Sequence, residues 1–342
     1  MTLVRVLGWR RLGPGVALAG VLAIAATSVS RLHGGPLPLY ALFFGMAFHY
    51  LSHELRTRPG IEFCARDVLR LGAGLLGARI TATQIAALGW GVGLWVLAGV
   101  ASTILLALWL GPRLGLNPAR SVLAGGAVAI CGASAALAIS AVLPPERKGD
   151  RFTLTVVICI TVLSTASMIV YPLLARALHL SPHQAALFLG GSIHDVAQVV
   201  GAGFTLGTET GELAVVVKLF RVALLAVVVL AVALAFKSAR ARAAAGSAGP
   251  APARQPLVPW FLWLFAALVL LNSNGQVAVA VQDALAELSR ICLVVAMAAL
   301  GVKTSFQDIA RAGWQPLVLI ASETLWLGAL MLAGAWWLAG AH

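Results

Sequence analysis

The chain has 342 residues, of which 60% are hydrophobic and only 11% are charged. This composition excludes an ordinary soluble domain, in which apolar residues make up about half and charged residues about a quarter of the chain. The formal net charge of +12 would suggest a nucleic-acid partner in a soluble protein. Here most Lys and Arg residues stand between apolar stretches, where they set membrane orientation. We therefore expect an all-α polytopic membrane protein that binds no nucleic acid.

Apolar stretches recur from end to end of the chain, and a helix needs about 20 such residues to cross a membrane. The first stretch follows Arg10 and Arg11 like a signal peptide, but no convincing cleavage site follows it, so we expect a retained span. A flexible basic linker is predicted at 237–256. The eleven stretches are 14–30, 36–51, 63–80, 88–110, 118–143, 151–178, 183–206, 211–236, 257–273, 289–303 and 313–340.

Loop charges predict the orientation of these stretches. If all eleven cross, the loops on the N-terminal side hold 14 Lys and Arg residues and the opposite loops hold 6. If 118–143 and 183–206 are re-entrant hairpins instead, the count becomes 16 against 4. Both arrangements predict a cytoplasmic N-terminus and an external C-terminus, and the charge count mildly favours hairpins, giving about nine to eleven transmembrane segments.

The chain also contains an internal repeat. Residues 76–90 align without gaps to residues 300–314, and six of the fifteen positions are identical. The two copies are an odd number of crossings apart in either arrangement, so they run in opposite directions. Inverted repeats of this kind are typical of secondary transporters. We expect one transporter domain with inverted halves at roughly 10–115 and 207–342, and with 118–143 and 183–206 between them.

The stretch 121–145 has a centre of very small side chains, Cys131, Gly132, Ala133 and Ser134. Glycine weakens a helix, and backbone that leaves a helix inside a membrane must lie against protein or a wet cavity. One interpretation is a helix-packing face of small residues. The other, which we favour, is a discontinuous helix whose free backbone groups line a substrate site.

A second polar stretch, 190–203, contains Gly191 and Ser192, followed by His194, Asp195 and Gln198. Ionisable residues inside an apolar segment are costly and usually functional. We assign the last three to proton or ion coupling, since histidine changes charge near neutral pH. The alternative is that Ser192 and Asp195 merely cap a helix start.

Three further charged residues lie within apolar stretches. Lys218 and Arg221 share a helix face, and we expect them to bind an anion, with snorkelling or pairing to Asp195 as alternatives. Alanine at Arg221 would then abolish transport and leave the fold intact. Glu323 is a weaker candidate, either as a proton carrier or as the partner of a buried base.

The sequence contains no nucleotide-binding glycine loop, metal-ligand cluster or nucleophile–base motif. Its four cysteines have no paired spacing, so neither a disulfide framework nor a zinc site is expected. We therefore predict a protein with no cofactor and no metal, which is not an enzyme.

Several motifs together resemble the UPF0324-type family of bacterial inner-membrane proteins, a sulfate exporter family by name. The resemblance covers nearly the whole chain and implies a transporter distantly related to cation–proton antiporters and bile-acid symporters, with inverted repeats and crossing broken helices. The motifs that carry it lie at 130–135, 190–200, 218–222, 259–261 and 298–301.

The leading hypothesis is a secondary transporter of a small anion such as sulfate or a sulfonate, coupled to H⁺ or Na⁺ in the bacterial inner membrane. A cation–proton antiporter is the alternative, and an intramembrane enzyme or a binding protein is less favoured; a homodimer is left open. The expected substrate-binding residues are Cys131, Gly132, Ala133, Ser134, Gly191, Ser192, Lys218 and Arg221. The expected coupling residues are His194, Asp195, Gln198 and Glu323.

Overall fold

The structure, a computed structural model, describes residues 2–33, 37–87, 89–144, 150–237, 260–303 and 314–339. Within these residues every regular element is helical, which confirms the all-α class. Helices suit a membrane because each satisfies its backbone polar groups internally. Six are long and apolar enough to span one: Arg11–His33, Gly89–Arg113, Phe152–Ala177, Thr208–Ala235, Val279–Lys303 and Trp314–Leu338.

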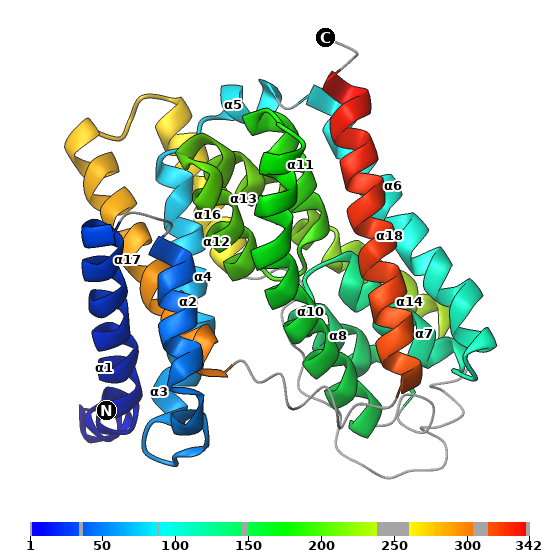
Figure 1. Ribbon diagram of the computed structural model, residues 1–342, viewed down its shortest axis with the longest axis horizontal. Coiled ribbons are helices and arrows are strands. Elements are labelled where there is room, and N and C mark those ends of the chain that lie inside the picture. Colours follow the sequence, from blue (N-terminus) through cyan, green and yellow to red (C-terminus); the bar gives the residue numbers. More distant parts are fainter. Residues whose placement is uncertain are drawn as a thin grey trace.

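The helices form two bundles, which lie to the left and right in Figure 1. The first bundle contains a helix interrupted by one π turn, in which the backbone bonds shift from i+4 to i+5. Its elements are α1 (Thr2–His33), α2 (Leu37–Ala47), α3 (Arg58–Phe63), η2 (Cys64–Val68), α4 (Leu69–Leu75), η3 (Leu76–Ala78), α16 (Trp260–Ser273) and α17 (Val279–Lys303). Helix α17 begins ten residues before the predicted stretch 289–303. The apolar pattern missed its first turns because they carry polar side chains.

The second bundle is larger and is joined to the first through α5 (Ala82–Ala87). Between the bundles lies α12 (Val196–Leu206), which packs against α13 and also contacts α2, α4 and α17. Most of the predicted linker lies outside the described residues. The other elements are α6 (Gly89–Arg113), α7 (Pro118–Ala129), α8 (Ala133–Val142), α10 (Asp150–Ala177), α11 (Pro182–Ser192), α13 (Thr208–Ala223), α14 (Leu225–Ala235) and α18 (Trp314–Ala339).

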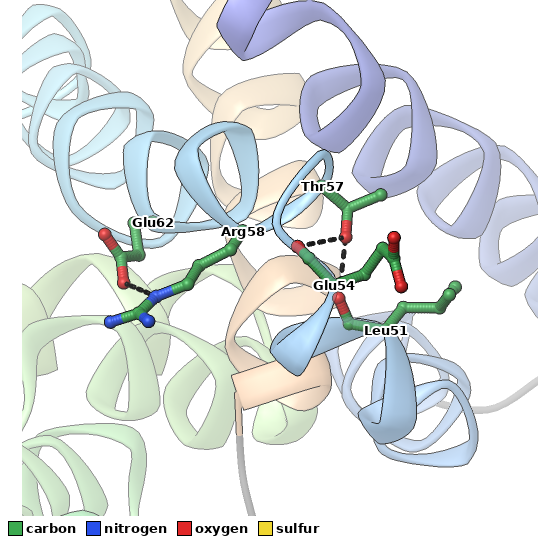
Figure 2. Close-up of polar contacts among 5 residues, drawn as sticks. All are labelled: Leu51, Glu54, Thr57, Arg58 and Glu62. Atoms are coloured by element: carbon green, nitrogen blue, oxygen red, sulfur yellow. Dashed lines mark hydrogen bonds and ion pairs between the residues drawn. The ribbon is translucent and has the colours of Figure 1, made fainter.

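A short turn after η1 (His49–His53) connects α2 to α3, and the Thr57 side chain bonds the backbone across it (Figure 2). The Thr57 hydroxyl donates to the Leu51 carbonyl oxygen at 2.6 Å and lies 3.3 Å from that of Glu54. Arg58 and Glu62 form an exposed ion pair at 3.0 Å. Exposed pairs of this kind contribute little stability, so the turn depends on the threonine.

Glycine contacts hold the first bundle together. A Cβ added to Gly301 of α17 would lie 2.1 Å from the Leu42 carbonyl oxygen of α2, and one added to Gly45 would lie 2.1 Å from that of Ala298. Such distances are far below van der Waals contact, so the two backbones touch directly. Close approach through small residues is how helices associate where no water drives them together.

The stretch 183–206 forms a hairpin, with both ends at the same side of the molecule. Arg176, at the end of α10, donates from Nη2 to the Thr205 carbonyl oxygen at the end of α12, at 2.7 Å. His183, at the start of α11, lies 3.8 Å from Glu209 at the start of α13. Because α11 follows directly on α10, and α13 on α12, the hairpin enters and leaves at one side.

The stretch 118–143 forms a matching hairpin. The Arg120 guanidinium, at the start of α7, lies over the Phe152 ring at the start of α10, 5.2 Å from its centroid. Near the end of α8, the Ser140 hydroxyl lies 3.3 Å from that of Thr153. Both ends of this hairpin therefore lie beside the start of α10, whereas the other hairpin opens beside its end. The arrangement favoured by loop charge is thus the one observed.

The helices that carry the two copies of the predicted repeat run in opposite directions. The Asn272 amide donates to the Ile80 carbonyl oxygen at 3.3 Å, so the first copy ends where α16 ends and α17 is about to begin. The second copy begins in the last turn of α17, which runs the opposite way, and its residues 304–313 lie outside the described residues. Without the two hairpins, nine of the eleven apolar stretches remain as passages, which agrees with the start of α1 and the end of α18 lying at opposite ends of the molecule (Figure 1).

Candidate functional site

The first hairpin is broken at 130–132, as the small-residue pattern predicted. Helix α7 ends at Ala129 and α8 begins at Ala133, with Gly132 between them at φ +66°. A Cβ at Gly132 would lie 2.9 Å from Ile160 and 3.5 Å from His194. Only glycine adopts this backbone conformation and fits this space without strain.

The second hairpin is broken at 193–195, between α11 and α12. Asp195 is the N-cap of α12, and its Oδ1 accepts from the Ala197 N–H at 2.9 Å. Ser192 does not cap this helix; its hydroxyl donates back to the Phe188 carbonyl oxygen within α11, at 2.5 Å. The capping interpretation therefore holds for Asp195 and is wrong for Ser192.

Lys218 and Arg221 of α13 are fully buried and lie where the two hairpin tips meet. The ammonium of Lys218 donates to the carbonyl oxygen of Ile130 at 2.5 Å and to that of Ile193 at 2.9 Å. The five Arg221 bonds are Nε to Ala129 O at 3.0 Å, Nη1 to Gly190 O at 3.3 Å and Ile193 O at 3.1 Å, and Nη2 to Val128 O at 3.0 Å and Ala129 O at 2.7 Å.

These contacts give both cations a role that differs from the predicted one. A guanidinium has five N–H donors, and all five of Arg221 are directed at carbonyl oxygens, so none is left for an anion. Neither cation snorkels, and neither forms an ion pair with a described acid. Both satisfy the orphan carbonyls at the C-terminal ends of α7 and α11, where the helix dipole is negative.

His194 connects the two hairpins to α18. Its Nδ1 lies 3.2 Å from the Val128 carbonyl oxygen of α7, and its Nε2 lies 2.9 Å from the Thr324 hydroxyl. The residue is fully buried. Sequence reasoning identified His194 but missed Thr324, whose only signal is its place beside Glu323 in an apolar span.

A hydroxyl network on α10 supports the second break. The Ser164 hydroxyl oxygen accepts from the backbone N–H groups of His194 and Asp195, each at 3.3 Å. The same hydroxyl donates to Gln198, whose amide nitrogen bonds Thr165 at 2.9 Å. Gln198 therefore helps to hold the second break against α10. Adjacent Ser and Thr within an apolar span were the sequence signal for this network.

The remaining predicted residues separate into three groups. Cys131 is buried at the tip, Ala133 is half-buried and Ser134 is exposed at the start of α8. Gly191 lies away from the tip, packed so closely on α18 that a Cβ would meet the Met331 sulfur at 2.5 Å. Glu323 is fully buried on α18, and neither of its carboxyl oxygens has a hydrogen-bond partner among the described residues.

Positive charge from the first bundle reaches the second break. Asp195 is half-buried, and its carboxylate interacts electrostatically with Lys218 and, across the bundle boundary, with Arg70 and Lys303. The site therefore brings together two helix starts, one acid and the bases Lys218 and Arg221 at the level of the hairpin tips. Among the described residues no group of His, Cys, Asp and Glu is arranged to hold a metal ion.

Two opposed, centrally broken hairpins within nine passages define a polytopic helical membrane protein with a polar centre. The chain belongs to the family described as conserved hypothetical protein 698, whose model matches residues 14–320. It is 47% identical to the UPF0324 membrane protein TauZ of Paracoccus denitrificans and 46% identical to that of Paracoccus pantotrophus, over 94% of each chain. A UPF0324 membrane protein of Chlorobaculum tepidum is 44% identical over 95% of this chain and 89% of its own.

Proposed function

We propose that the protein is a secondary active transporter, which moves a small oxyanion such as sulfate or a sulfonate across the bacterial inner membrane by alternating access. The observation that most supports this is the meeting of two broken hairpins at Gly132 and His194. Discontinuous helices whose N-terminal ends point at an anionic group are a recurring site design in secondary transporters. The proposal includes a cytoplasmic N-terminus and no chemical change of the substrate.

The start of α8 is the best candidate for the anion contact. Its N-cap, Gly132, provides no side-chain hydrogen bond, and both Ala133 and Ser134 have accessible surface. The start of α12, by contrast, is already capped by Asp195. Free amides and a positive dipole end favour an oxyanion.

Lys218 and Arg221 support this site indirectly. Each hairpin tip brings a negative helix end and a positive helix end to the same place. The two cations bond the carbonyls of the negative ends. The positive end of α8 thereby stays available to an anion, whereas that of α12 is capped by Asp195.

A cation–proton antiporter is the second candidate, favoured by the half-buried Asp195 carboxylate at the same tips. Lys218 interacts with this carboxylate electrostatically. In that case Na⁺ or H⁺ would bind Asp195 in competition with the Lys218 charge.

Thermal stabilisation of the purified protein by oxyanions and by Na⁺, at about pH 6 and about pH 8 on either side of the ordinary range of histidine, tests both candidates. We expect stabilisation by sulfate or methanesulfonate that is lost in Ser134→Leu, which covers the start of α8. Ala141→Leu, an exposed position at the far end of the same helix, is the matched control. Proteoliposome uptake of labelled sulfate, recovered unchanged, completes the test.

Stabilisation by Na⁺ alone, abolished in Asp195→Asn, would select the antiporter instead. Equal sulfate binding by Ser134→Leu and the control would remove the α8 start from the anion site.

A further inference from the structure

Glu323 differs from the other charged residues of the centre in having no hydrogen-bond partner in the part of the chain that the structure describes. His194, Lys218 and Arg221 bond oxygens of neighbouring elements, and Asp195 accepts from a backbone N–H. Glu323 is 0% exposed, and neither carboxyl oxygen has a hydrogen-bond partner among the described residues. A buried polar group without a partner costs free energy, and a charged one costs far more.

The packing of α18 places this carboxyl at mid-height in the second bundle. Helices α18 and α6 run antiparallel, and a Cβ on Gly99 would lie 3.3 Å from Leu327. Glu323, one turn earlier, therefore lies at the level of Thr103. The Thr103 hydroxyl donates its proton to the Gly99 carbonyl oxygen at 2.7 Å, so it stabilises no negative charge on Glu323.

The charged and titratable groups around this part of α18 are few. Helices α6, α7, α10 and α11 pack against it. His194 reaches α18 from the second break and contacts Thr324, and Tyr171 of α10 packs on α18 one turn further on. Lys218 and Arg221 arrive from α13 but are committed to carbonyl oxygens. No described cation lies within ion-pair distance of Glu323.

We propose that Glu323 binds the proton that couples anion transport to the proton gradient. The neutral acid fits the described surroundings, whereas the carboxylate lacks both donors and counter-charge. Thr324, the next residue, bonds His194 at the hairpin break. If Glu323 loses its proton, the surroundings of this part of α18 change. Thr324 of the same helix would then pass that change to His194 at the substrate site. The coupling role rests on the proposed transport function, but the protonation does not.

Infrared spectroscopy of the purified protein tests the protonation directly. A protonated carboxylic acid has a C=O stretch distinct from that of a carboxylate. We expect this band near neutral pH in the wild type, its loss in Glu323→Gln and its retention in Glu287→Gln. Glu287 is the matched control, because it is exposed and ion-paired with Arg290 at 2.6 Å. Identical spectra of wild type and Glu323→Gln would overturn the proposal, whatever the protein transports.

Proteoliposomes with a clamped membrane potential test the coupling. One pH unit supports about tenfold accumulation if one proton moves with each anion. Glu323→Gln mimics the neutral acid, so we expect it to keep anion exchange and to lose this accumulation, whereas Glu287→Gln keeps both. Accumulation by Glu323→Gln equal to wild type, or driven by Na⁺ instead, would overturn the coupling role. A wild type that moves no anion would defeat the proposed function and leave the spectroscopic result to decide the protonation.

Discussion

The two buried bases of α13 bond the carbonyl ends of helices, and neither forms an ion pair with a described acid. Lys218 and Arg221 make seven hydrogen bonds, all to carbonyl oxygens at the ends of α7 and α11. Their spacing indicated a shared helix face, which is correct. Their partners could not be predicted, because the carbonyls of 128–130 and of 190 and 193 come from distant parts of the chain.

This geometry changes the expectation for Arg221→Ala. The Val128, Ala129 and Gly190 carbonyls would lose their guanidinium donors, and each unsatisfied buried polar group costs about 1–3 kcal/mol. We expect a lower unfolding temperature in detergent, measured by intrinsic fluorescence, with Arg221→Lys in between. Arg58→Ala is the control, because its ion pair is exposed and worth at most about 1 kcal/mol. An unchanged unfolding temperature with lost sulfate binding would restore direct anion binding by Arg221.

At the scale of the elements, glycine placement decides which helices touch. Gly77 and Gly301 occupy equivalent positions in the repeat, and each allows a neighbouring backbone to approach: Phe265 of α16 for the first, Leu42 of α2 for the second. The shared Leu-Gly order of the two copies was visible in the sequence. The structural reason for it was not visible, because the helices that pack on these glycines, α16 and α2, lie elsewhere in the sequence.

We expect Gly301→Ala to separate α2 from α17 and to destabilise the protein by about 1–3 kcal/mol, the usual range for an overpacked site. The cause is the new Cβ, which would lie 2.1 Å from the Leu42 carbonyl oxygen. Gly20→Ala in α1 is the matched control, because its Cβ would meet nothing within 4 Å. Thermal unfolding of both variants is the measurement, and equal unfolding temperatures would contradict the contact.

At the scale of the whole molecule, the two bundles meet along α12 and through an ion pair at their boundary. Arg79 Nε of the first bundle lies 3.0 Å from Glu212 Oε1 of α13. Alternating access needs one part of a transporter to move against another. A pair that joins the bundles would have to break in that movement.

Charge reversal at this pair tests the movement. Arg79→Glu and Glu212→Arg should each alter the sulfate flux in proteoliposomes, and the double reversal should restore it. Their effect on stability should stay within about 1 kcal/mol, because Arg79 is 47% exposed. Full flux in both single variants would show that the pair does not join moving parts.

The sequence by itself indicated the helical class, the apolar stretches and an interruption within each of the stretches 118–143 and 183–206. These features follow from hydrophobicity, glycine content and local order, which act over a few residues. Only the tertiary structure decided that both broken stretches are hairpins, that Arg221 has no free donor and that the Glu323 carboxyl has no hydrogen-bond partner among the described residues. Those outcomes depend on which distant carbonyls and helices come within hydrogen-bonding distance, and no local pattern encodes that.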